Sequence, residues 1–256
     1  MGWKDKPTIR IHLHKVCSDR MGFSELPCRA SAMSLPFTTD QFLDIFAKYN
    51  VVVWPVQSLL YLLGVSCIVL ALRRATWSSS IISLILSLLW LWMGVVYHFL
   101  FFSKINQAAW LFGAFFILQS LVFVYAGLTT RKLSFHVARD AYGIVGALLL
   151  TYVFIIYPAL GYLVGHRYPR MPTFGLPCPT TIFTFGMLLW ASPKVPGYVL
   201  IVPLVWSLIG FFAALSLSIH EDFGLLAAGI AGTTLIVLRN NRARPAIDAN
   251  GKSNFR

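Results

Sequence analysis

Residues 80–102 read SIISLILSLLWLWMGVVYHFLFF and contain no acidic residue, no lysine and no arginine. At 1.5 Å of rise per residue, a helix of this length extends about 35 Å. The hydrocarbon core of a bilayer is roughly 30 Å thick, which takes about 20 apolar residues to cross. This stretch therefore predicts a transmembrane helix.

Six further apolar runs accompany it, and together they set the fold class. The seven runs cover approximately residues 51–72, 80–102, 108–128, 141–164, 178–192, 197–218 and 222–238. The fifth is short and opens at Pro177-Cys178-Pro179, so it reads either as a span or as a re-entrant segment. We expect an all-α, polytopic transmembrane bundle of about seven spans, or of six spans plus a re-entrant segment.

The composition supports a chain whose main solvent is lipid. Of 256 residues, 57% are hydrophobic and only 12% are charged, whereas a soluble domain carries about 25% charged residues. Between Tyr49 and Leu238 the only acids are Asp140, Glu221 and Asp222. The net charge of +12 does not indicate nucleic acid, because the basic residues lie singly or in pairs at the ends of apolar runs.

Three regions divide the chain. Residues 1–32 lack the apolar run of a signal peptide, and we expect a disordered or non-native extension with Met33 as the natural start. Residues 33–238 form one transmembrane domain, and residues 239–256 form a basic cytoplasmic tail. Within the domain, residues 37–48 predict a short amphipathic helix in the membrane interface, capped by Thr38 or Thr39 and apolar on one face.

The basic residues of the short loops predict the orientation. With seven spans, nine of them fall on one side and four on the other; the nine are Arg73, Arg74, Arg131, Lys132, Arg139, Lys194, Arg239, Arg242 and Arg244, and the four are Lys48, Lys104, Arg167 and Arg170. The first side is therefore expected to be cytoplasmic, with the amino terminus outside and the carboxyl terminus inside. If the fifth segment were re-entrant, the two termini would share one side.

This topology gathers most of the chemically versatile side chains at the extracytoplasmic face. The candidate functional cluster consists of His98, His166, Arg167, Cys178, Glu221 and Asp222; Asp40 and Asp44 are expected at the same face. Four of these residues also have a plainer interpretation. His98 reads as an interfacial residue, Glu221 and Asp222 as partners of a helix dipole, and Cys178 as a small apolar side chain.

The chemistry of this cluster stays open at the level of sequence. A thiol near His166 suits either a metal ligand or an activated nucleophile, and cysteine, histidine and carboxylate together suit zinc or a related transition metal. The chain contains no His-x-x-x-His or Cys-x-x-Cys pair, no Walker loop and no dinucleotide fingerprint. We therefore assign no catalytic role and no organic cofactor.

Three stretches resemble a bacterial family of multi-pass inner-membrane proteins, catalogued as a domain of unknown function and sometimes labelled transporter permeases. They are GHRYP at 165–169 continuing to GLPCPTTIFT at 175–184, residues 36–50, and EDFGLL at 221–226. The resemblance covers roughly residues 33–238. It implies a bacterial inner membrane and supplies no mechanism.

Three functions are consistent with these observations. The first is a small-solute or ion permease with an extracytoplasmic polar site. The second is a metal-handling or thiol-dependent membrane enzyme. The third is a non-catalytic subunit of a larger membrane complex. The expected partners are the lipid bilayer and either further copies of this chain or other subunits, and not nucleic acid.

Overall fold

A computed structural model describes residues 35–73 and 75–242. The elements are α1 (Thr39–Val52), α2 (Val56–Arg73), α3 (Ser78–Trp92), η1 (Met93–Phe101), η2 (Phe102–Lys104), α4 (Ala109–Phe123), η3 (Val124–Thr129), β1 (Ser134–Phe135), α5 (Ala141–Thr151), η4 (Tyr152–Ile156), α6 (Tyr157–Leu163), α7 (Pro177–Leu189), β2 (Ala191–Ser192), η5 (Gly197–Val199), α8 (Ile201–Leu217), η6 (His220–Asp222) and α9 (Phe223–Arg242). The expected extension at residues 1–32 lies outside the described residues, as do residues 243–256 of the expected tail.

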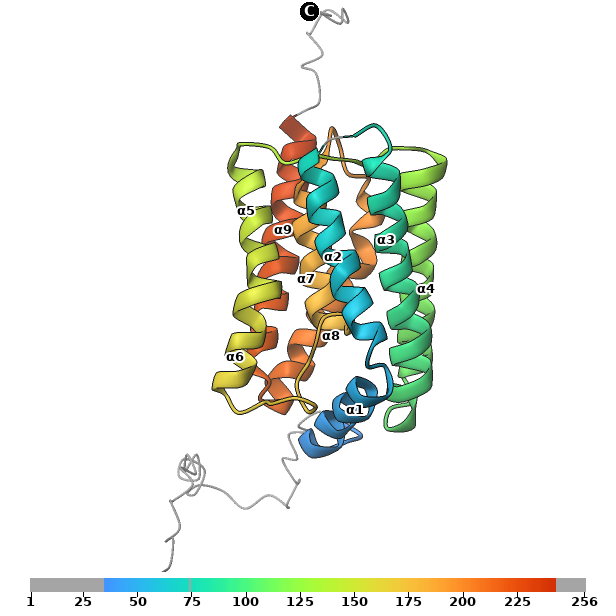
Figure 1. The fold of residues 1–256 in the computed structure, drawn as a ribbon, viewed down its shortest axis with the longest axis vertical. Helices are drawn as coiled ribbons and strands as arrows, with labels where there is room; N and C mark the ends of the chain where they lie inside the picture. The colour runs from blue at the N-terminus through green and yellow to red at the C-terminus, as the bar shows by residue number, and fades with distance from the viewer. Residues whose placement is uncertain (1–34, 74, 243–256) are drawn as a thin grey trace, which may run out of the picture. The chain divides into compact units, whose positions relative to one another are not determined.

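Within residues 35–73 and 75–242, six helical stretches are long and apolar enough to cross a membrane, which confirms the predicted polytopic bundle. Figure 1 shows them side by side, with neighbouring segments running in opposite directions. The first begins at Val56 rather than near residue 51, because Pro55 lacks the N–H that a continuous helix needs. The last continues to Arg242, four residues beyond the domain boundary at residue 238 that the sequence suggested.

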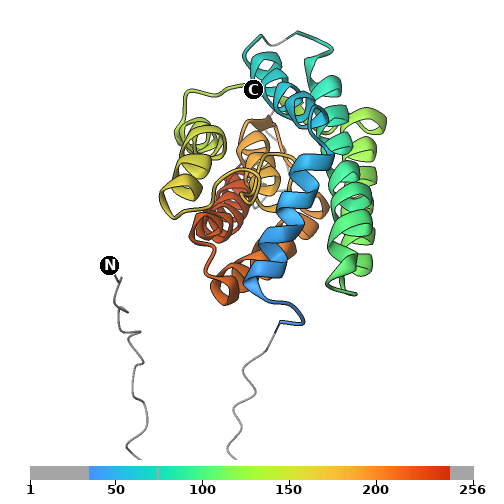
Figure 2. The same cartoon turned by 60° about the horizontal axis from the view of Figure 1, so that its bottom comes forward.

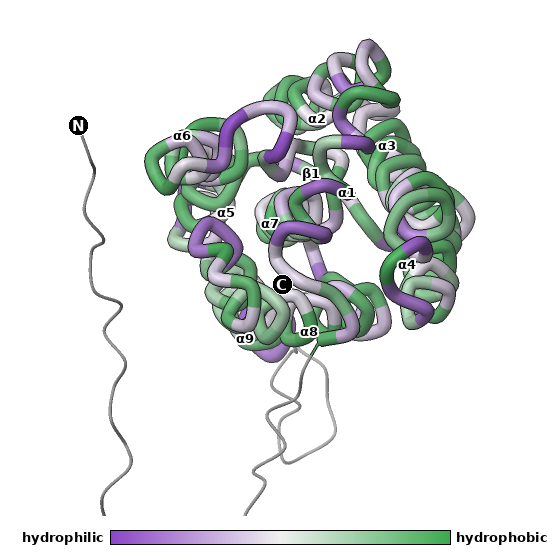
Figure 3. The backbone as a smooth tube through the Cα atoms, turned by 90° about the horizontal axis from the view of Figure 1, so that it is seen from below, coloured by the Kyte–Doolittle hydropathy of each residue, from purple (hydrophilic) through white to green (hydrophobic). Residues whose placement is uncertain are grey.

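The fifth predicted segment forms the centre of this bundle. Its helix, α7, has only 13 residues, and nearly all of them are buried. In the view of Figure 3, α7 lies inside a ring made by α2, α3, α4, α8, α9 and the α5–α6 stretch. A helix that carries no charged residue can be buried all round in this way, and the Thr180 and Thr184 hydroxyls find partners inside the bundle.

Contacts at its two ends show that the α7 segment leads from one end of the bundle to the other. At the end that carries the α2–α3 loop, β2 pairs with β1, and the Arg239 guanidinium donates to the Leu189 and Leu188 carbonyls at 2.9 and 3.3 Å. At the opposite end, the Asn50 amide of α1 donates to the Pro169 and Met171 carbonyls at 2.7 and 2.8 Å. The helix is short because residues 164–176, which precede it, form turns and bends instead of helix.

The amphipathic helix α1 lies across the end of the bundle (Figure 2). Thr38 caps it in a reciprocal capping box with Gln41, as the sequence predicted. Its apolar face buries Phe42, Ile45 and Phe46, also as predicted. Because these side chains pack against the ends of the spanning helices, α1 covers the part of the bundle where α7 begins.

Candidate functional site

The candidate site lies at the α1 end of the bundle, where three segments meet. They are residues 164–176 after α6, the first turn of α7, and the 3₁₀ turn η6 that leads into α9. The Thr39 hydroxyl lies 3.5 Å from the Leu217 carbonyl, so the turn before η6 also lies beside α1. The sequence predicted that these segments gather at the extracytoplasmic face; in the structure they lie at one end of the bundle.

His166 and Glu221 form the outer pair of the site. The His166 Nδ1 lies 2.6 Å from the Glu221 Oε1, and the His166 backbone N–H donates to the Gly161 carbonyl at 2.8 Å. The His166 side chain is 16% exposed, whereas that of Glu221 is fully buried. Within the described residues, the second carboxyl oxygen of Glu221 has no hydrogen-bond partner. The imidazole is therefore the group that connects this buried carboxyl to water.

Asp222 forms the inner part of the site with different partners. The Tyr157 hydroxyl donates to the Asp222 Oδ1, and the Cys178 thiol contacts the same carboxyl. Asp222 is only 3% exposed. Two consecutive carboxyls thus point to two separate sets of partners, one reaching the surface and one reaching the central helix.

The start of α7 provides a favourable place for the Asp222 carboxyl. Cys178 lies in the first turn of α7, between Pro177 and Pro179, so Asp222 lies near the positive end of that helix dipole. No side chain caps this turn, and the two prolines remove N–H groups that would otherwise need partners there. Helix polarity therefore helps to stabilise an acidic side chain away from water.

Cys178 does not have the partners that thiol activation would require. Its neighbour is the Asp222 carboxyl, while the His166 ring contacts Glu221 instead. A nearby carboxylate does not favour a thiolate, whereas an imidazolium would. Across the part of the chain that the structure describes, no group of three or more His, Cys, Asp or Glu side chains is arranged to hold a metal ion. The geometry therefore lends no support to the zinc or nucleophile alternatives.

The remaining predicted residues lie apart from the carboxyl pair. His98 is fully buried among aromatic rings. Trp206 lies between His98 and Cys178: the Trp206 ring centroid is 5.2 Å from that of His98, and the Trp206 indole also contacts the Cys178 thiol. The Arg167 guanidinium lies 4.9 Å from the Tyr162 ring centroid and does not reach Glu221 or Asp222. Arg167 therefore lies beside the site without contacting either carboxyl.

Asp40 and Asp44 of α1 serve the surface of the same end. The Arg170 Nη2 lies 3.1 Å from the Asp40 carboxyl and 2.8 Å from the Asp44 carboxyl. Both carboxylates raise the pKa of the Arg170 guanidinium. Because all three side chains are exposed, the pairs hold the loop against α1 only weakly.

Sequence reasoning missed the tyrosines that complete the site. Besides Tyr157, the Tyr152 hydroxyl donates to the Glu221 carbonyl at 2.7 Å. Both residues lie within an apolar run that gives no polar signal, and a π-helical turn, η4, separates α5 from α6 at this point. π-Helical turns occur often at functional sites, but such a turn is visible only in a structure. The sequence therefore gave no signal for these tyrosines.

The six long helices around a central short helix, with titratable groups at one end, define a polytopic α-helical membrane protein. The chain belongs to a family of unknown function, DUF6064, whose model matches residues 39–246. No curated protein and no solved structure matches it.

Proposed function

We propose that this protein is a small-solute or ion permease of the bacterial inner membrane, with its polar site at the start of α7. The observation that carries the proposal is the pair of consecutive buried carboxyls, of which Glu221 contacts the partly exposed His166 and Asp222 contacts Tyr157 and Cys178. The family itself is of unknown function, so the proposal rests on the geometry of this chain.

The first support is the interrupted form of the α7 segment. A helix of 13 residues extends about 20 Å, less than the roughly 30 Å of a hydrocarbon core. Irregular backbone at membrane depth is tolerated where protein covers it or where it lines a cavity, and broken helices often supply the binding site of transporters. The irregular backbone before α7 is covered in this way, since the Gly175 carbonyl accepts from the Tyr49 hydroxyl at 3.3 Å.

The second support is the chemistry of the buried groups. Ionisable residues inside membrane domains are costly and are found along ion and proton pathways. Here the partly exposed His166 contacts buried Glu221, and the neighbouring Asp222 contacts Tyr157 and Cys178. We infer that a proton taken up at His166 passes to the carboxyls, and that their protonation is linked to movement of the solute.

A transport assay in bacterial membrane vesicles tests this proposal. Vesicles that hold a pH gradient, reported by a fluorescent amine, are challenged with alanine, lactate, glucose, phosphate, Na⁺ and K⁺ in turn. We expect at least one of these probes to dissipate the gradient only when the protein is present. Asp222→Asn should abolish this response, because an amide, unlike a carboxyl group, does not take up and release a proton.

Asp140→Asn is the matched control for the loss of one carboxyl. Asp140 caps α5 by accepting from the Gly143 N–H at 2.8 Å, and asparagine caps a helix equally well. This variant should therefore behave as the unmodified protein. A response that survives in Asp222→Asn would remove the carboxyl from the mechanism, and folded protein with no response to any probe would contradict the permease.

We further propose that the His166 end faces the extracytoplasmic side, with the chain's carboxyl terminus in the cytoplasm. The support is the excess of lysine and arginine in the loops at the opposite end. A carboxyl-terminal fusion to green fluorescent protein should be bright, and the matching alkaline phosphatase fusion should be inactive, because that enzyme folds only outside the cytoplasm. The reverse pattern would contradict this orientation.

A further inference from the structure

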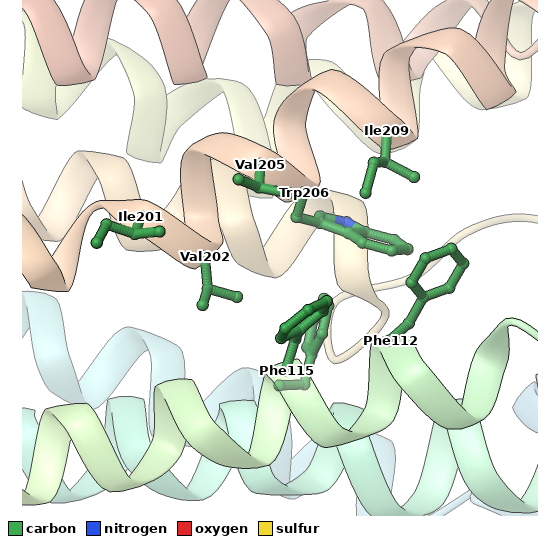
Figure 4. A pocket seen from close by; sticks show the side chains of 8 residues that line it. Phe112, Phe115, Ile201, Val202, Val205, Trp206 and Ile209 are labelled. Atoms are coloured by element: carbon green, nitrogen blue, oxygen red, sulfur yellow. The ribbon is translucent and has the colours of Figure 1, made fainter.

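An apolar groove opens on the flank of the bundle between α4 and α8. Unlike the site of the carboxyl pair, it is lined by apolar and aromatic side chains. Its volume is about 170 Å³, and its lining includes Phe112, Phe115, Phe116, Val202, Trp206 and Ile209. Figure 4 shows Phe112 and Phe115 of α4 facing Val202, Trp206 and Ile209 of α8. An apolar cavity of roughly 150 Å³ holds one benzene-sized molecule, so the groove has room for a single ring.

The occupant of this groove is expected to come from the membrane. Both α4 and α8 belong to the stretches that are long enough to span a bilayer, and Phe115 and Val205 at the groove remain 41% and 43% exposed. Lipid-soluble molecules can therefore reach it sideways. A plain acyl chain would satisfy such a lining, so a second feature is needed to identify the ligand.

That feature is His98, which lies directly behind the groove. Its imidazole is fully buried, and neither ring nitrogen has a hydrogen-bond partner within residues 35–73 and 75–242. Its ring centroid lies 4.6 Å from that of Phe116, 5.2 Å from that of Trp206 and 6.0 Å from that of Phe112. All three of these residues also line the groove.

The environment of His98 calls for a polar partner. Burying an imidazole without hydrogen bonds is unfavourable, because the ring gives up its bonds to water and gains none. A neutral imidazole has one N–H donor and one acceptor nitrogen. His98 also lies in a π-helical stretch, Met93–Phe101, a form that is often found at functional sites.

We propose that the α4–α8 groove binds a lipid-soluble quinone, that is, a flat carbonyl-bearing ring with an apolar tail. The ring stacks among Phe112, Phe116 and Trp206, one carbonyl accepts a hydrogen bond from His98, and the tail extends into the bilayer. Rotation of one of the aromatic rings opens the path to the imidazole. An acyl chain carries no hydrogen-bond acceptor, whereas a quinone ring carries carbonyls, which is why the orphaned histidine favours a quinone.

Binding is tested with decylubiquinone and the purified full-length protein in phosphatidylcholine nanodiscs. Trp206 lies in the groove, so bound quinone should quench part of the intrinsic tryptophan fluorescence in a saturable manner, above the linear quenching caused by quinone dissolved in lipid. His98→Leu removes the hydrogen-bond donor and puts an apolar side chain of similar size in its place. We expect this variant to fold and to bind at least about tenfold more weakly, as for the loss of one hydrogen bond in an apolar site.

A pair of substitutions on α8 separates the groove from the rest of the lipid-facing surface. Val205→Phe should fill the groove and abolish saturable quenching, whereas Leu208→Phe, at a lipid-facing position outside the lining, should leave it unchanged. Decylbenzene, which has the tail and ring but no carbonyl, should not compete. The proposal is overturned if His98→Leu binds as tightly as the unmodified protein, if Val205→Phe still saturates, or if decylbenzene competes equally. This test does not involve the carboxyl pair, so its result is independent of the proposed transport.

Discussion

Gly186→Leu is expected to prevent the central helix from packing and to remove most of the folded protein. Gly186 of α7 and Gly146 of α5 face each other: a Cβ at Gly186 would lie 2.9 Å from the Leu150 side chain and 3.2 Å from the Gly146 carbonyl oxygen. A leucine needs far more room, and α7 cannot move away because other helices surround it. Small residues at such contacts are what allow membrane helices to approach closely.

The size of this effect should exceed that of any surface substitution. Overpacking in a core costs typically 1–3 kcal/mol and occasionally more, and the closed ring around α7 places Gly186→Leu at about 3 kcal/mol or above. Detergent-solubilised protein should lose its monodisperse peak in size-exclusion chromatography. Gly197→Leu is the matched control, since a Cβ at Gly197 meets nothing within 4 Å. A normal peak and melting temperature for Gly186→Leu would show that α5 and α7 do not pack as described.

His166→Leu should produce the second large effect, a loss of about 3 kcal/mol in the free energy of unfolding. The substitution leaves Glu221 fully buried without the one side-chain partner that it has among the described residues, and removing one member of a buried pair costs roughly 3–5 kcal/mol. The lower end of that range applies because His166 is partly exposed, so water enters part of the space it leaves. Thermal melting in detergent measures the change.

The matched series distinguishes loss of the His166–Glu221 contact from loss of packing. His166→Leu/Glu221→Leu should regain most of the stability, because replacing both partners by apolar groups is often close to neutral. Glu221→Leu alone should cost less than His166→Leu alone, since the remaining imidazole still reaches water. Arg167→Leu, which removes only a cation–π contact with Tyr162, should cost no more than about 1 kcal/mol. A double variant as unstable as His166→Leu would show that the isolated carboxyl is not the cause.

These substitutions also separate the two roles of the carboxyl end. His166 and Glu221 are expected to affect stability strongly, because their pairing compensates for burial. Asp222 retains helix polarity and the Tyr157 hydroxyl as support, and asparagine keeps its size and can still accept from that hydroxyl. Asp222→Asn should therefore remove proton exchange with little loss of folded protein, which makes it the variant that tests function.

The class of the protein followed from its sequence alone, because the signals for it are local. The length of residues 80–102 and the absence of charge in them predict a membrane span whatever surrounds it. The capping residue Thr38 and the spacing of Phe42, Ile45 and Phe46 likewise determine α1, since a cap and an amphipathic face need only residues a few positions apart. The alternation of seven spans likewise predicted His166, Cys178 and Glu221 at a common face, because it depends only on where each apolar run begins and ends.

Only the tertiary structure decided which of these residues touch. The helices of a membrane protein are apolar on the side that faces lipid as well as on the side that faces protein. The sequence therefore does not tell which side meets a neighbouring helix, and it did not indicate that α7 is central. The close approach of Gly186 and Gly146 sets the rotation of α7 about its own axis. With α7 in this orientation, Cys178 contacts Asp222 rather than His166. Membrane spans are determined by transfer of each segment into lipid, whereas the partners of a side chain depend on the packing of segments far apart in the chain.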